Sequence, residues 1–171
     1  FDSVLGEGTG AGMIFGNTGG VMEAALRTVY RVLEGKEAPA DFYQLRPVRG
    51  LSNRKEAEVT IAGKKLRVCI LYGTAAAEKF LAEDMNGYHF VEVMTCPGGC
   101  ISGAGQPDCG SVPVSDVVRK KRIQSLYQAD EQAERRNSMD NPEIGTIYHE
   151  FFKEPLSMLS EKLLHTTYKG K

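Results

Sequence analysis

Two cysteines four positions apart, Cys96 and Cys100, are the side chains of this chain best suited to bind a metal. They follow a short apolar run, Phe90 to Met94, and the Pro-Gly-Gly between them forces the chain to turn, so both sulfurs can point toward one place. Further glycines close behind let the backbone approach a bulky object. Thiolate sulfur is a ligand that iron and zinc both accept. From spacing alone, a metal or cluster site and a structural or redox pair are equally acceptable interpretations.

The other two cysteines do not complete a zinc pattern, which usually pairs two CxxC units. Cys69 lies inside the apolar run Leu66 to Tyr72, so we expect a buried, inert thiol. Cys109 lies in a loop, where it is either a third ligand or, as we expect, an exposed free thiol.

A second glycine-rich stretch precedes the first long helix. We expect this helix from Val21 to Leu33, with Thr18 or Asn17 as its cap and Gly35 at its end. The amino end of a helix carries partial positive charge and free N–H groups, and therefore suits an anionic ligand. The alternative is a core helix on a glycine turn. The helix has an apolar stripe that ends at Val32-Leu33, while Glu23, Arg27 and Arg31 fall largely on another face.

Three stretches resemble the iron-only (FeFe) hydrogenases. EVMTCPGGCISGAGQP, residues 92–107, resembles the family's third signature segment, ExMACxxGCxxGGGQP. GAGMIFGNTGGVMEAALR, residues 10–27, resembles its glycine-rich segment GxxIFGxTGGVMEAALR, and residues 126–168 resemble its C-terminal helices, including the closing LLHTTY. Thr95 stands where the family has Ala, and Ala104 where it has Gly. Together these stretches cover nearly the whole chain.

The resemblance implies a role for each site residue. Cys96 would bind a 4Fe–4S cubane, and Cys100 would bridge the cubane to a two-iron subsite with CO and CN ligands, which together form the H-cluster. Met94 would face the same pocket. Three further residues would wall the two-iron site and keep it dry: Phe15, Gly16 and Val21. The implied activity is the reversible conversion of H2 into protons and electrons, with a ferredoxin-like electron carrier as partner.

Two family segments are absent from the chain. The other two cluster cysteines of the family lie in segments of the type TSCCPxW and MPCxxKxxE, and neither occurs here. The resemblance therefore implies the C-terminal half of the H-cluster domain. The missing N-terminal half would supply two more thiolates and the proton relay.

The order of apolar segments predicts an α/β lobe. Alternation from Glu56 to Ile61, a turn at residues 62–64 and the apolar run to Tyr72 predict a hairpin. A helix from Thr74 to about Asp84 and a strand from Tyr88 to Met94 complete a strand–helix–strand unit. The resemblance implies one lobe of the two-lobed hydrogenase catalytic domain, with a small, mostly parallel sheet, flanking helices and a helical C-terminal tail. Cys96 then follows the carboxyl end of a strand, where ligands collect in such sheets.

Helices are also expected in the rest of the chain, at 117–134, 141–152 and 157–165. We therefore divide the chain into an α/β cluster-binding lobe, residues 1–115, and a helical segment, residues 116–171, packed on the same domain. The basic run Arg119 to Arg122 is either a docking patch for a partner or a solvated helix face. The acids that follow, Asp130 among them, favour the solvated face.

Composition excludes several functions and partners. The formal net charge is -1 and the pI is about 6.4, which gives no electrostatic reason to expect nucleic acid or an anionic membrane. The sequence has no apolar stretch long enough for a membrane span. Its 4 cysteines are too few for a disulfide scaffold, so we expect reduced thiols in the cytoplasm, with the periplasm as the alternative.

Three classes of function remain. The chain is the catalytic part of a hydrogenase, a hydrogenase-like iron–sulfur assembly or binding protein without the two-iron site, or a folded fragment without metal. The long matches favour the hydrogenase, and the chain alone is expected to be incomplete and inactive.

Overall fold

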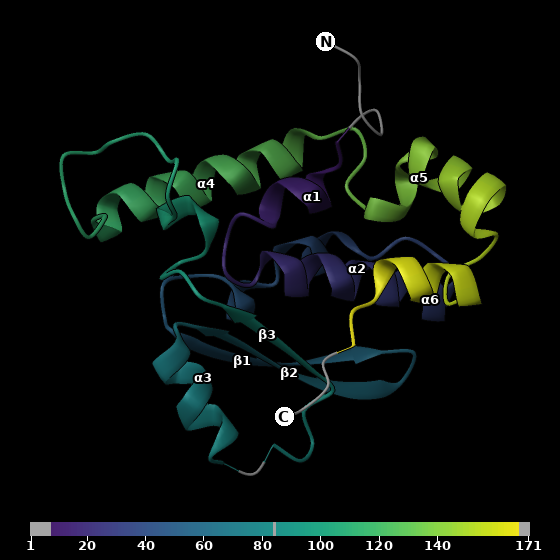
Figure 1. Cartoon of the computed structure of the whole chain (residues 1–171), viewed down its shortest axis with the longest axis horizontal. Helices are drawn as coiled ribbons and strands as arrows, with labels where there is room; N and C mark the ends of the chain where they lie inside the picture. Colours follow the sequence, from purple (N-terminus) through teal and green to yellow (C-terminus); the bar gives the residue numbers. More distant parts are fainter. Residues whose placement is uncertain (1–7, 84, 168–171) are drawn as a thin grey trace.

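The computed structural model describes residues 8–83 and 85–167 and shows an α/β arrangement in layers (Figure 1). A three-stranded sheet has the order β1-β2-β3. Helix α2 covers one face of the sheet, α3 lies on the other, and α4 lies outside α1 and α2 (Figure 1). The elements are α1 (Gly10–Ile14), α2 (Gly20–Glu34), β1 (Arg54–Ile61), β2 (Lys64–Tyr72), α3 (Thr74–Leu81), β3 (Phe90–Met94), α4 (Asp116–Gln132), α5 (Pro142–Ile147) and α6 (Met158–Leu164). The predicted α/β fold class is confirmed.

Strands β1 and β2 form the predicted hairpin. They pair antiparallel, and Ala62 (φ 50°) and Gly63 (φ 70°) join them in the left-handed conformation typical of a two-residue hairpin turn. Strand β3 pairs with β2 in parallel after the α3 crossover, which confirms the strand–helix–strand unit. The sheet is mixed, and the expectation of a mostly parallel sheet was wrong in this detail. A two-residue turn reverses the chain, so it cannot connect parallel strands.

Strand β2 is the centre of the core because both of its faces are covered. Val68 and Ile70 pack under α2, whereas Cys69 and Leu71 pack with Phe80 of α3. All are at most 3% exposed. The prediction of a buried Cys69 is therefore confirmed, and burial raises the pKa of its thiol.

Helix α2 buries other residues than the predicted stripe. Met22 and Leu26 face the sheet, while Val32 and Leu33 are 63% and 51% exposed. Glu23 and Arg27, which we predicted on a separate polar face, are completely enclosed. The prediction failed because α2 is covered on two sides, by the sheet and by the α1–α4 layer, so its polar side faces protein instead of water.

Helix α4 packs along α1, a short helix that the glycine-dense sequence did not predict. The backbone N–H of Gly10 donates to the carbonyl of Arg135 at 2.8 Å, and that of Ala11 donates to the carbonyl of Arg136 at 3.1 Å. A Cβ on Gly10 would lie 2.2 Å from the Oδ1 atom of Asp130. Only glycine therefore permits this approach.

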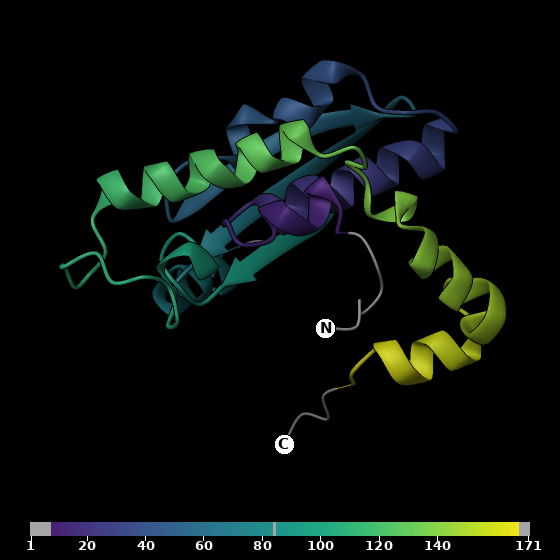
Figure 2. The same ribbon diagram turned by 90° about the horizontal axis from the view of Figure 1, so that it is seen from above.

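The C-terminal elements form an arm that leads away from the sheet (Figure 2). Helix α5, a π-helical turn at Tyr148–Phe152 and α6 lie close to the predicted ranges. Phe152 is buried, but several large apolar side chains of the arm are exposed: Phe151, Leu156, Met158, Leu163 and Leu164. Within the described ranges, no helix combines the length and the apolar character that a membrane span needs.

Candidate metal centre

The two cysteines of the motif lie in a turn directly after β3, as predicted. Both are free and exposed. The N–H of Gly99 donates to the carbonyl of Cys96 at 2.9 Å, and the N–H of Gly103 donates to the carbonyl of Cys100 at 3.0 Å. A Cβ on Gly103 would lie 3.9 Å from the Cys96 sulfur and 3.8 Å from the Cys100 Cα. One bare glycine therefore borders both cysteines, and both thiols remain open to a ligand.

The cysteine loop is joined directly to the other glycine-rich segment. The N–H of Thr18 donates to the carbonyl of Gly98 at 3.2 Å, and the N–H of Ile101 donates to the carbonyl of Gly16 at 3.1 Å. A Cβ on Gly99 would lie 2.8 Å from both the Gly16 oxygen and the Thr18 nitrogen. Glycine is thus needed here so that the two motif segments can touch each other.

Glu92 holds the amino end of α2 against β3, a role that sequence reasoning missed. Its buried carboxylate accepts from the N–H groups of Gly19 at 2.6 Å and Met22 at 2.7 Å. It thereby supplies the cap that we had expected from Thr18 or Asn17. Burial raises the pKa of Glu92, although the two N–H groups and nearby Lys55 oppose the rise.

Lys55 secures the same loop from β1. Its ammonium group donates to the carbonyls of Thr18 at 2.7 Å and Gly50 at 3.2 Å. Burial lowers the pKa of Lys55 to about 8, against the attraction of Glu92. Burial therefore disfavours the charged form of both groups, and the attraction between them offsets part of this effect.

Helix α4 supports the cysteine loop from the outside. The guanidinium of Arg122 donates to the carbonyls of Ile101 at 2.6 Å and Pro107 at 2.7 Å. This member of the basic run thus binds the site loop, and the expectation of a purely solvated face was wrong for it. A cavity of about 250 Å³ remains between the loop and α4, lined by Gly16, Cys100, Ile101, Gln106, Arg122, Ser125 and Leu126.

A buried ionic cluster joins α2 to α4 behind the site. Arg27 pairs with Asp130 at 2.7 Å and with Glu23 at 2.8 Å, and all three side chains are fully buried. Arg49 and Arg136 complete the cluster at its rim. Burial alone would raise the pKa of Asp130, but hydrogen bonds from Arg27 and Arg136 lower it below its ordinary value. The prediction that Asp130 balances a solvated face was therefore wrong.

The remaining predicted site residues differ in their positions and in their exposure to solvent. Gly16 borders the same cavity as Cys100. Phe15 is 44% exposed, Val21 is half-buried at the start of α2, and Met94 is half-buried at the end of β3. Their assigned roles stay predictions.

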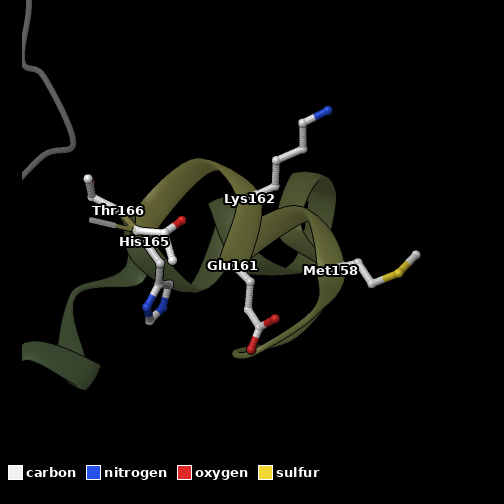
Figure 3. A pocket seen from close by; sticks show the side chains of 6 residues that line it. Met158, Glu161, Lys162, His165 and Thr166 are labelled. Carbon is white, nitrogen blue, oxygen red and sulfur yellow. The ribbon is translucent and has the colours of Figure 1, made fainter. Parts of the chain in front are cut away.

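Other candidate positions do not form a site. Cys109 is a half-buried free thiol, and contacts to Ser111 lower its pKa. A larger hollow of about 730 Å³ lies beside α6, lined by Met158, Glu161, Lys162, His165, Thr166 and Thr167. Figure 3 shows Lys162 and Met158 pointing away from Glu161 and His165. One segment of the chain lines this hollow, and its side chains do not point toward a common place where a ligand could bind.

Two cysteines are half of a cluster site. Over residues 8–83 and 85–167, no group of three or more His, Cys, Asp or Glu side chains comes together in a way that could hold a metal ion. A 4Fe–4S cubane needs four thiolates. The pair at Cys96 and Cys100 suits two of them, because both are soft ligands, exposed and flanked by bare backbone. Fold and site define an α/β protein with two exposed cysteines that suit two of the four ligand positions of a thiolate-bound cluster.

Comparison with known proteins agrees with this class. Residues 1–104 match the family described as iron only hydrogenase large subunit, C-terminal domain, and residues 116–171 match the iron hydrogenase small subunit. The chain belongs to the iron-only hydrogenase family.

Three relatives illustrate the range of similarity. Iron hydrogenase 1 of Clostridium pasteurianum is 40% identical over 98% of this chain and 30% of its own length. Protein NAR1 of Arabidopsis thaliana is 30% identical over 98% of this chain and 36% of its own. A solved variant of [FeFe]-hydrogenase HydA1 from Chlamydomonas reinhardtii superposes with a TM-score of 0.71 at 33% identity, over 98% of this chain and 48% of that one. The chain thus spans less than half the length of each of these relatives.

Proposed function

We propose that this chain forms the C-terminal half of an FeFe hydrogenase catalytic domain, which interconverts H2 with protons and electrons. The observation that carries the proposal is the junction of the two motif segments, where backbone hydrogen bonds join residues 16–18 to the Cys96–Cys100 loop and leave both thiols exposed. Identity to iron hydrogenase 1, at 40%, also exceeds the 28% identity to cytosolic iron-sulfur assembly component 3 of Mus musculus.

In this proposal the chain's own residues bind and enclose an H-cluster. Cys96 and Cys100 would supply two thiolates to the 4Fe–4S cubane, and Cys100 would also hold the two-iron subsite with its CO and CN ligands. The cluster, when bound, supplies the hydrogen chemistry. Three residues wall the two-iron side and exclude water: Phe15, Gly16 and Val21. Met94, at the end of β3, faces the same pocket.

The support behind these residues follows from the contacts already described. Glu92 and Lys55 hold the glycine-rich loop in place, and Arg122 holds the cysteine loop on α4. Such outer contacts orient the ligands of a metal site. The upstream half of the domain supplies the other two thiolates and the proton relay, and a ferredoxin-like carrier exchanges electrons with the cubane.

A second candidate is an iron–sulfur assembly or binding protein without the two-iron site. The similarity to cytosolic iron-sulfur assembly component 3 of Mus musculus, 28% identical over 90% of the chain, supports it. A cubane bound through Cys96 and Cys100 suits both functions, so only the two-iron subsite separates them.

Reconstitution with the upstream half of the domain tests the proposal. The two halves are produced together without oxygen and with the maturation proteins that build the cluster. Hydrogenase function predicts bound iron, infrared bands from CO and CN, and hydrogen evolution. Cys100→Ser should remove the infrared bands, whereas the matched control Cys109→Ser should keep them. Bound iron without these bands would favour the assembly function, and no bound iron would contradict both.

A further inference from the structure

The two edge strands of the sheet, β1 and β3, differ in how well they are protected from pairing with another strand. Strand β1 bears half-exposed or exposed charges at Arg54, Glu56 and Glu58. Strand β3 contains one charged residue, Glu92, and that side chain is buried toward α2. Natural edge strands carry outward charges, prolines or bulges, because an open edge otherwise pairs with another strand. The sequence of β3, FVEVM, contains no proline and no outward charge.

An apolar groove lies directly beside this edge. Val91 and Val93 alternate with Glu92 and therefore lie on the opposite face of the sheet, toward α3. The groove has a volume of about 230 Å³ and is lined only by apolar residues: Leu71, Ala77, Phe80, Leu81, Met85, Val91 and Val93. Val93 is 55% and Leu81 65% exposed, so the groove is open to solvent.

We propose that the open edge of β3 and the neighbouring groove bind an apolar β-strand from the upstream half of the catalytic domain. This inference rests on the proposed function. The HydA1 chain is about twice as long as the part that this chain covers, 48%, so the family's domain contains a comparable length of further polypeptide. An apolar strand fits because an edge strand offers backbone groups for pairing and the groove offers no charge.

This pairing would also align the metal centre. Strand β3 ends at Met94, and Cys96 follows two residues later. A strand paired with β3 is therefore about 4.8 Å from the strand that leads to the cysteine loop. Docking at this edge fixes how far the thiolates of the upstream half lie from Cys96 and Cys100.

An association measurement without iron tests the inference. The probe is the upstream half of the catalytic domain of Clostridium pasteurianum iron hydrogenase 1, which is 40% identical to this chain over 30% of its own length. Val93→Lys introduces a charge at the open edge, and Thr60→Lys introduces the same residue at an exposed position of β1. We expect Val93→Lys to weaken binding more than about tenfold, because the ammonium loses its water on docking, and Thr60→Lys to leave binding unchanged. Amide hydrogen exchange of residues 90–94 should slow on binding.

The proposal is wrong if the two halves do not associate, if both lysine variants bind equally well, or if exchange at residues 90–94 stays fast in the complex. Protection of these amides in the chain alone, rising with its concentration, would instead assign the edge to a second copy. Denaturant unfolding of Val93→Lys verifies that the variant folds. Because iron is absent, the measurement is independent of hydrogenase function. Edge-dependent association without later infrared bands would contradict that function alone, and infrared bands without edge dependence would contradict this inference alone.

Discussion

Charged residues of the same types occupy two very different regions of this protein. Behind the cysteine loop, Arg27 pairs with Asp130 and Glu23 at 2.7 and 2.8 Å, and none of the three side chains is exposed. On the outer side of the hairpin, Arg67 pairs with Glu56 at 2.9 Å while the two side chains remain 49% and 33% exposed. The distances are nearly equal, so the difference between the two clusters is burial.

Burial decides what each cluster does. Removing one partner of a buried pair leaves a charge that water cannot reach, which costs several kcal/mol. An exposed pair exchanges its partner for water at little cost. We therefore infer that the buried cluster determines how α4 sits against the motif segments, whereas the exposed cluster adds little to a hairpin that its turn and core already specify.

The largest effect is expected from the buried cluster. Asp130→Ala should lower the free energy of unfolding by about 3–5 kcal/mol, because Arg27 would remain buried without its main partner. Urea unfolding measures the change. The neighbouring exposed residue provides the control, and Glu131→Ala should stay within about 0.5 kcal/mol. Equal effects of the two variants would show that burial does not separate the two regions.

The second largest effect is expected for Glu92→Gln, which should lower the free energy of unfolding by about 2–3 kcal/mol. The amide can accept from only one of the Gly19 and Met22 N–H groups in the same geometry, and Lys55 loses the opposing charge. Hydrogen exchange at Gly19 and Met22 should accelerate in parallel with the loss of stability. Glu58→Gln, on the exposed side of β1, is the matched control. If exchange at both amides stayed at its original rate, the assignment of Glu92 as the cap of α2 would be wrong.

Two glycines test the contact between the motif segments. Gly99 (φ 93°) and Gly105 (φ 87°) share a backbone conformation that disfavours alanine, but only a Cβ on Gly99 meets neighbouring atoms, at 2.8 Å. Gly99→Ala should therefore lower the free energy of unfolding by about 1–3 kcal/mol more than Gly105→Ala does. Thermal unfolding of both variants gives the difference, and the absence of a difference would mean that the segments separate freely.

The smallest effect is expected at the exposed cluster, and it depends on pH. A hydrogen bond from Tyr88, assisted by Arg67 and Arg54, lowers the pKa of Glu56 from 4.5 to about 2. The unfolded chain takes up this proton first, so the stabilisation is present above pH 4.5 and is lost as the pH falls toward 2. Glu56→Gln should lower the free energy of unfolding by less than about 1 kcal/mol at neutral pH. It should also make the free energy of unfolding less dependent on pH between these two values. A profile as steep as that of the unmodified chain would assign the acid sensitivity elsewhere, Asp130 being the first candidate.

Local patterns in the sequence were sufficient to predict much of the fold and the cysteine pair at the centre of the site. The hairpin was predicted from a turn at residues 62–64 between an alternating run and an apolar run, and α2 was predicted from the glycine at its end. The position of Cys96 after a parallel strand followed from the order of the elements, and the family followed from two long motifs. Each of these features depends on neighbouring residues in the chain, so the sequence by itself determined them.

The tertiary structure alone decided which polar groups are inside. Glu23 and Arg27 have the spacing of a solvated helix face, and Asp130 belongs to a segment rich in charge, yet all three meet in the interior. Glu92 alternates like any strand residue, but its carboxylate caps a helix more than seventy residues earlier in the chain. Local periodicity records which residues share a face. It does not record what covers that face, because covering depends on contacts between segments far apart in the sequence.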